Sequence, residues 1–268
     1  MSISDAWDAS VPDSGLSPAG ILQRSSTIEA LERFDSPARG VFGFNSRDRR
    51  SRPFNLLRAQ VLKIMRANKW KIIGVTSATP RVGKSFMASN LAASLSRIPG
   101  TRTLLFDLDL RRGSIAGKFG IPDGPGINTF LAGEIDSLDA AAYDIANTGL
   151  TIFPSFPTDD SSAELLAGNR LRTLVKAMRA LPDNVICICD LPPAFANDDT
   201  AIVLREIDAY LFIVEEGKTT AHQVRDAIEL LKPAPCMGTI LNRYRGGIGG
   251  DDYGFGYGTQ RYYDAYYG

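Results

Sequence analysis

Residues 71–76 form an apolar, β-like stretch that leads through the octapeptide at 78–85, Ala-Thr-Pro-Arg-Val-Gly-Lys-Ser, into a helical pattern. Backbone N–H groups at a helix N-terminus cradle polyphosphates, a lysine there adds positive charge, and a hydroxyl is placed for Mg²⁺. We therefore interpret residues 78–85 as a phosphate-binding loop in which Lys84 and Ser85 have these roles. Ala78 stands where the usual pattern has its first glycine.

Composition indicates a globular chain with one sizeable core. The 268 residues carry 30 basic and 30 acidic side chains, so net charge gives no support to a nucleic-acid partner. Cys187 and Cys189 alternate with isoleucines in an expected buried strand, which favours a reducing cytoplasm over a disulfide framework or zinc site. No apolar run approaches the ~20 residues of a membrane helix. Any membrane role is therefore expected to come through a partner.

Three regions differ in composition. Residues 1–50 are rich in Ser, Pro, Asp and Gly and are expected to be flexible, and residues 51–245 form the predicted domain that contains the phosphate loop. Residues 246–268 consist largely of glycine and tyrosine and predict a mobile tail.

A cluster of arginines precedes the predicted domain. One interpretation is a solvated basic hinge, and the other is docking to anionic lipid headgroups or to an acidic partner. The cluster comprises Arg47, Arg49, Arg50 and Arg52.

Short apolar runs alternate with helical patterns between residues 71 and 242. This alternation predicts an α/β fold, a mostly parallel sheet with helices on both faces and ligands at the carboxyl ends of the strands. The expected strands are 71–76, 102–107, 150–153, 184–189, 209–215 and 236–241, and the expected helices are 84–97, 163–180, 198–206 and 219–231.

Two of the expected strands end in aspartate. Asp107 and Asp109 follow one, and Asp190 follows another. In a parallel sheet these ends share the edge that carries the phosphate loop, and Mg²⁺ prefers oxygen ligands. Asp107 and Asp109 lie two apart, so on an extended segment they point to the same side. Two close acids also raise one pKa, which suits a general base.

The three loops, taken together with a C-terminal tyrosine cluster, resemble the bacterial tyrosine kinases that work with polysaccharide chain-length regulators. The similar segments are 78–85, Phe106–Arg111, Ile188–Pro193 and the tail, in that family's order, and the resemblance covers about residues 52–268. Only the combination is specific, since many ATPases share each loop. The resemblance implies a P-loop NTPase fold of the deviant Walker group, which includes the partition ATPases.

The resemblance also implies an activity, transfer of the γ-phosphate of ATP to tail tyrosines, and a role for each matching residue. Lys84 would bind phosphate and take part in catalysis, and Asp107 would be the base. Ser85, Asp109 and Asp190 would organise Mg²⁺. The implied nucleotide-binding residues are Pro80, Arg81, Val82, Gly83, Lys84, Ser85, Phe86, Asn242 and Arg243. The implied acceptors are Tyr253, Tyr257, Tyr262, Tyr263, Tyr266 and Tyr267.

The implied partners are a membrane chain-length regulator acting as activator, a second copy of the chain, and a counteracting tyrosine phosphatase. Such a regulator would recruit the protein from the cytoplasm to the inner face of the membrane and link it to exopolysaccharide or capsule synthesis. The family's Glu-x-x-Arg-x-x-Arg helix packs subunits into a ring. Only its last arginine, Arg58, is present here, where Arg52 and Asn55 take the two earlier positions.

Two other functions remain open. A partition or positioning ATPase shares the fold, but such proteins carry an extra lysine at the position of Thr79 and do not end in tyrosine clusters. A non-catalytic, nucleotide-binding regulatory subunit is favoured by the altered ring helix and opposed by the intact loop lysine and aspartates. Family members also carry smaller residues at the position of Arg81, whose side chain would contact phosphate, block it or face solvent.

Overall fold

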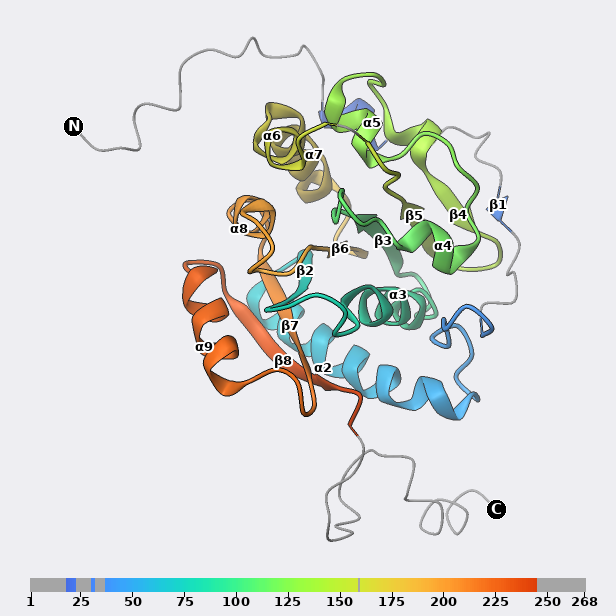
Figure 1. Ribbon diagram of the computed structural model, residues 1–268. Coiled ribbons are helices and arrows are strands. Elements are labelled where there is room, and N and C mark those ends of the chain that lie inside the picture. The colour runs from blue at the N-terminus through green and yellow to red at the C-terminus, as the bar shows by residue number, and fades with distance from the viewer. Residues whose placement is uncertain (1–17, 23–29, 32–36, 159, 245–268) are drawn as a thin grey trace, which may run out of the picture.

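The computed structural model describes residues 18–22, 30–31, 37–158 and 160–244 (Figure 1). These residues build one sheet with the strand order β1-β4-β5-β3-β6-β2-β7-β8. The strands are β1 (Ala30–Leu31), β2 (Ile72–Ser77), β3 (Arg102–Asp107), β4 (Tyr143–Ile145), β5 (Leu150–Phe153), β6 (Val185–Asp190), β7 (Ala209–Glu215) and β8 (Cys236–Asn242).

Neighbouring strands run parallel, and within the described part only β4 and β5 pair antiparallel. Every residue of β2 and β6 is buried, as expected for central parallel strands that are covered on both faces. The register places Asp107 of β3 beside Asp190 of β6. The carboxyl ends of β2, β3 and β6 therefore meet at one edge of the sheet.

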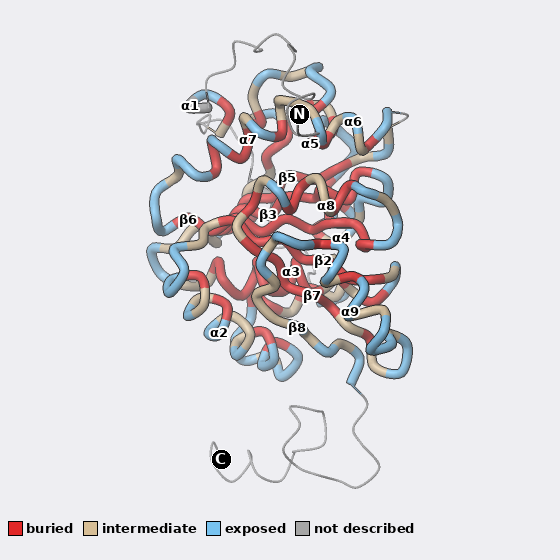
Figure 2. Tube along the Cα trace, turned by 90° about the vertical axis from the view of Figure 1, so that its left-hand side faces the viewer, coloured by how far each residue is buried: buried red, intermediate tan, exposed pale blue. Residues whose placement is uncertain are grey.

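Helices cover both faces of the sheet, and each face packs its own cluster of buried apolar side chains. Figure 2 shows the buried strands between helices whose outer surfaces are exposed. One face carries α2 (Arg52–Asn68), α3 (Lys84–Leu95) and α4 (Ile115–Phe119). The other carries α1 (Pro18–Ile21), α5 (Ile127–Ala132), α6 (Ser162–Ala167), α7 (Asn169–Ala180), α8 (Asp199–Leu204) and α9 (Ala221–Leu230). Two short 3₁₀ helices, η2 (Arg49–Ser51) and η3 (Leu138–Ala141), complete the described elements.

The predicted α/β class is confirmed, and each expected strand is present within a residue or two of its predicted bounds. The single helix expected over 163–180 is wrong in one respect. Gly168 adopts an extended conformation and separates α6 from α7. Helix α2 was not predicted from periodicity, although it buries Phe54, Val61 and Met65.

Residues 37–51 pack against α3, so part of the segment expected to be flexible is ordered. Val41 is fully buried, and the Asn90 side chain on α3 binds the backbone at Phe42 N (2.7 Å), Gly43 N (3.1 Å) and Gly40 O (2.9 Å). A β-carbon on Gly43 would lie 2.3 Å from the Asn90 carbonyl oxygen, so only glycine permits this approach. Composition alone missed the segment because few of its residues are apolar.

The predicted tail, 246–268, lies outside the described residues, and so do all six acceptor tyrosines. Most of the predicted flexible start, including residues 1–17, lies outside them as well. The three domain boundaries remain predictions. Among the helices that the structure describes, none has the length and apolar character needed to cross a membrane.

Candidate nucleotide site

The loop between β2 and α3 has the geometry of an anion site. Gly83 caps α3 with φ of 99°, and Lys84 is the first residue of the helix. Such a start leaves the first backbone N–H groups of the helix without intrahelical partners and directs them toward a ligand. Ala78 is buried and has no positive φ, so its position in this loop does not require glycine.

Arg81 adopts a left-handed backbone conformation, with φ of 65°. This conformation is unfavourable for residues with a β-carbon. Glycine avoids that cost because it has no β-carbon, so a smaller residue such as glycine is physically favoured at the position of Arg81. The Arg81 side chain is exposed at the rim of the cleft.

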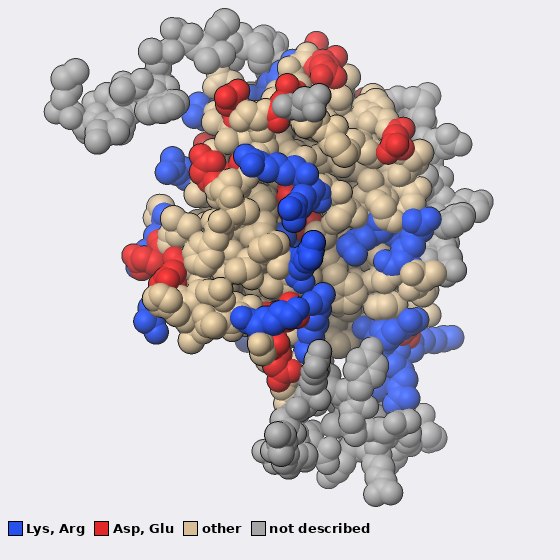
Figure 3. Space-filling model, viewed as in Figure 1, with Lys and Arg blue, Asp and Glu red and all other residues tan. Residues whose placement is uncertain are grey.

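An open cleft of about 1350 Å³ lies over the loop. Figure 3 shows Lys and Arg side chains gathered in a column down the middle of this face. The acidic lining comes from Asp109, and the basic lining comes from Arg39, Arg81, Lys84, Arg111, Arg112, Lys118 and Arg243. The cleft is therefore suited to an anionic ligand.

Lys84 and Asp109 face each other at the base of the cleft. Their Nζ and Oδ2 atoms are 3.7 Å apart, and both residues are largely buried. Burial raises the pKa of Asp109, an effect that the positive charge of Lys84 partly opposes. The loop lysine is thus held beside a carboxylate that shares its cleft.

Asp190 is fully buried, and neither of its oxygens accepts a well-formed hydrogen bond from a described residue. Burial raises the pKa of Asp190 to about 7, although Lys84 and the nearby Ser85 hydroxyl act in the opposite direction. A buried carboxylate without partners is unfavourable unless a cation or a proton compensates it. The Ser85 hydroxyl and Asp190 therefore fit Mg²⁺, which commonly takes one or two protein oxygens together with phosphate and water.

Asp107 lies beside Asp190, but its carboxylate oxygens accept hydrogen bonds from backbone N–H groups. Its Oδ2 accepts hydrogen bonds from Ser114 N (2.9 Å) and Ile115 N (3.0 Å), and its Oδ1 accepts a longer one from Asp109 N (3.3 Å). Burial and the neighbouring Asp190 charge raise the pKa of Asp107 well above its usual value. The structure thus brings the three predicted acids together, with only Asp109 lining the open cleft.

Asn242 and Arg243, which the resemblance implied as nucleotide-binding, lie at the end of β8 and directly after it, and both line the cleft. The Asn242 amide donates to Val82 O (2.7 Å), which holds the phosphate loop from the side. Arg243 pairs with Glu215 (2.7 Å). Phe86 also lines the cleft, while its ring packs edge to face against Phe42 and Phe54.

Lys118 is a cation that the sequence reasoning missed. It lies on α4, lines the cleft, and its ammonium forms no ion pair with a described residue. Burial lowers its pKa, while the Asp190 charge acts in the opposite direction, so the two groups interact. Nothing in the local pattern around residue 118 indicated this, because the side chain reaches the cleft only once α4 packs beside the loop.

Known proteins identify the family. The chain is 31% identical to the tyrosine-protein kinase YwqD of Bacillus subtilis over 193 residues, which is 71% of this chain and 78% of that protein. The chain belongs to the bacterial tyrosine kinases. No protein-family model matches it.

Other bacterial tyrosine kinases are much longer than this chain. It is 31% identical to the putative tyrosine-protein kinase EpsB of Ralstonia nicotianae over 201 residues, 74% of this chain but 26% of EpsB. The tyrosine-protein kinase etk of Escherichia coli K12 is 31% identical over 188 residues, 69% of this chain and 25% of etk. The chain thus spans about a quarter of each of these relatives.

Solved structures agree with this assignment. The kinase domain of Escherichia coli ETK superposes with a TM-score of 0.64 at 26% identity, covering 76% of this chain and 79% of that one. A ParA family ATPase from Chlorobium tepidum superposes with a TM-score of 0.53 at 22% identity, covering 66% of this chain and 75% of the other. The chain therefore shares its fold with a ParA family ATPase as well as with a tyrosine kinase domain.

Proposed function

We propose that this protein is a protein-tyrosine autokinase that transfers the γ-phosphate of ATP to tyrosines of its own tail or of a neighbouring copy. The observation that carries the proposal is a phosphate loop whose Lys84 and Ser85 lie beside the buried Asp190, a carboxylate that accepts no well-formed hydrogen bond, in a member of this family. The proposed acceptors are Tyr253, Tyr257, Tyr262, Tyr263, Tyr266 and Tyr267.

The loop and its basic surroundings would bind the triphosphate. Backbone N–H groups from Arg81 to Phe86 would cradle the phosphates, next to Pro80, which has no N–H to donate, and the Lys84 ammonium would stabilise the charge that develops during transfer. Ser85, Asp109 and Asp190 would hold Mg²⁺, which neutralises phosphate charge. Asn242 and Arg243 border the part of the cleft that we assign to adenine.

In the transfer step, the tyrosine oxygen bonds to the γ-phosphorus as the bond from that phosphorus to the β,γ-bridging oxygen breaks. ADP leaves with the electron pair, and the phenolic proton passes to a carboxylate. Asp107 is the proposed base, supported by its raised pKa and its place beside Asp190. Asp109 is the competing candidate, because it lines the cleft while the Asp107 oxygens accept backbone hydrogen bonds.

The first test is incubation of the full chain with Mg·ATP, followed by phosphosite mapping by mass spectrometry. Wild type should gain phosphotyrosine in the tail, whereas Lys84→Met and a chain truncated after Arg245 should not. Lys176→Met is the matched control, because Lys176 is an exposed lysine of α7 remote from the loop. Tail phosphorylation that persists in Lys84→Met would contradict the proposal.

A pair of substitutions distinguishes the two candidate bases. Asp107→Asn should abolish transfer while ATP binding persists if Asp107 accepts the proton, and Asp109→Asn should do so if Asp109 does. Thermal unfolding of both variants is needed, because the Asp107 carboxylate also holds the backbone of α4. Transfer that survives both substitutions would contradict a carboxylate base from this pair.

The competing function, a nucleotide-binding regulatory subunit, is favoured by the engagement of both Asp107 oxygens with backbone groups. Such a protein would bind ATP and transfer no phosphate. It would also tolerate Asp107→Asn in assays of partner binding, which separates it from the kinase.

We further propose a membrane chain-length regulator as activator, with self-association and a tyrosine phosphatase acting on the same tail. Each phosphate adds about −1.5 to −2 charge, so a modified tail would repel its neighbours and disperse an assembly.

Adding the cytoplasmic segment of a candidate regulator should increase tail phosphorylation. An unchanged rate would contradict its role as activator. Recruitment by that regulator would hold this cytoplasmic protein at the inner face of the membrane during exopolysaccharide or capsule synthesis.

A further inference from the structure

The segment from residue 46 to residue 71 is strongly basic in a chain of zero net charge. Its single acidic residue is Asp48. Its basic residues are Arg47, Arg49, Arg50, Arg52, Arg58, Lys63, Arg66, Lys69 and Lys71. The segment includes the whole of α2 and the turn before it.

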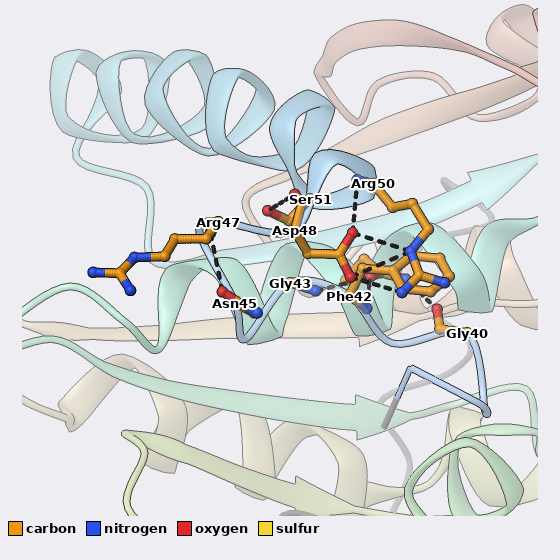
Figure 4. A network of polar contacts seen from close by, with 9 residues as sticks. Gly40, Phe42, Gly43, Asn45, Arg47, Asp48, Arg50 and Ser51 are labelled. Carbon is orange, nitrogen blue, oxygen red and sulfur yellow. Dashed lines mark hydrogen bonds and ion pairs between the residues drawn. The ribbon is translucent and has the colours of Figure 1, made fainter. Parts of the chain in front are cut away.

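Asp48 is already engaged by a neighbour. Its carboxylate accepts hydrogen bonds from Arg50 Nε (3.0 Å) and Nη2 (2.7 Å), and the Arg50 guanidinium lies 4.1 Å from the centre of the Phe42 ring (Figure 4). The Arg47 side chain extends away from this network. The network orders the turn, so its exposed arginines are displayed from a fixed backbone.

On α2, Arg52, Lys63 and Arg66 are exposed, whereas Arg58 lies on the packed side and donates to Ser94 O (2.9 Å). The buried side of the helix, Phe54, Val61 and Met65, packs toward α3, while Lys63 and Arg66 are exposed. Neither of these two forms an ion pair with a described residue. Leu56 is 46% exposed on the same outer side, so the charged face also offers an apolar side chain.

We propose that this outer face of α2, with the turn that precedes it, docks on an anionic lipid surface. The helix has 17 residues, which corresponds to roughly 25 Å at 1.5 Å per residue. Its cations are spread along that length, as suits a planar surface of diffuse negative charge. A second copy of α2 is a poor occupant, because it would bring like charges together. This contact with lipid is distinct from recruitment by a protein partner and does not depend on phosphoryl transfer.

Vesicle sedimentation of the full chain without nucleotide tests this inference. One set of vesicles is phosphatidylcholine alone, and the other is an equal mixture of phosphatidylcholine and phosphatidylglycerol. We expect binding to the mixed vesicles only, weakened by salt. Lys63→Gln/Arg66→Gln should weaken binding about 25-fold, or about fivefold for each cation removed.

The matched control is Arg205→Gln/Arg225→Gln. It removes two exposed arginines near α8 and in α9, on the opposite face of the sheet, and it should bind like wild type. Equal binding to both vesicle types, or equal losses in both variants, would overturn the inference. Binding to soluble polyglutamate but not to vesicles would overturn it in favour of an acidic protein partner.

Discussion

The Asn242 side chain donates a 2.7 Å hydrogen bond to the carbonyl oxygen of Val82, which joins the end of β8 to the middle of the phosphate loop. The same amide nitrogen lies so close to Gly83 that a β-carbon there would approach it to 2.2 Å. The shape of the loop therefore depends on a residue 160 positions along the chain.

Asn242→Ala should weaken ATP binding about fivefold, because a hydrogen bond worth about 1 kcal/mol no longer holds the loop in its binding conformation. Titration calorimetry with Mg·ATP measures this effect. Asn68→Ala is the control, since its amide also makes one hydrogen bond to a carbonyl, that of Ile64, far from the cleft. Unchanged affinity in Asn242→Ala would show that the loop keeps its shape without this bond.

Arg81→Gly should stabilise the nucleotide-free protein by about 1 kcal/mol, because glycine adopts the left-handed conformation of this position without steric cost. The expected rise in melting temperature is about 2–4 °C. Arg81→Ala removes the same charge but keeps a β-carbon, so it should bring no comparable gain. If both variants gain equally, the charge of Arg81 is responsible instead of its backbone conformation.

Lys118→Met should lower Mg·ATP affinity or the rate of tail phosphorylation by roughly 10- to 150-fold, because charge-assisted contacts to phosphate are worth about 1.5–3 kcal/mol. We expect a contact between Lys118 and phosphate because this lysine lines the cleft and interacts with the charge of Asp190. Lys176→Met serves again as the control. Wild-type binding and transfer in Lys118→Met would place this lysine outside the phosphate site.

The stability of the nucleotide-free protein should depend on Asp190. In the folded state its pKa is about 7, against a usual value of 3.8, so the folded protein holds this proton more tightly than the unfolded chain. The contribution of Asp190 to stability therefore falls as pH rises between these two values.

Asp190→Asn should thus raise the free energy of unfolding at pH 8 by about 1–3 kcal/mol, with a smaller gain toward pH 5. Urea unfolding across this pH range measures it. Asp123→Asn, in an exposed loop, should leave the pH dependence unchanged. A variant no more stable than wild type at pH 8 would contradict the raised pKa.

Local sequence patterns were sufficient to predict the phosphate loop and the strands that flank it. A run such as Val185–Asp190 is apolar at consecutive positions because both faces of a central parallel strand are covered. The aspartates were predicted to converge because parallel strands end at one edge, and Asp107 and Asp190 are register partners there.

The sequence by itself determined the class of fold, the place of the phosphate loop and the acids beside it. Strand periodicity and loop chemistry depend on residues that are close together in the sequence, so local patterns reveal them. Only the tertiary structure decided that residues 37–51 pack on α3, that Lys118 enters the cleft and that Asn242 holds Val82. These contacts join segments far apart in the chain. Their energies depend on burial and distance after packing, which no local pattern encodes.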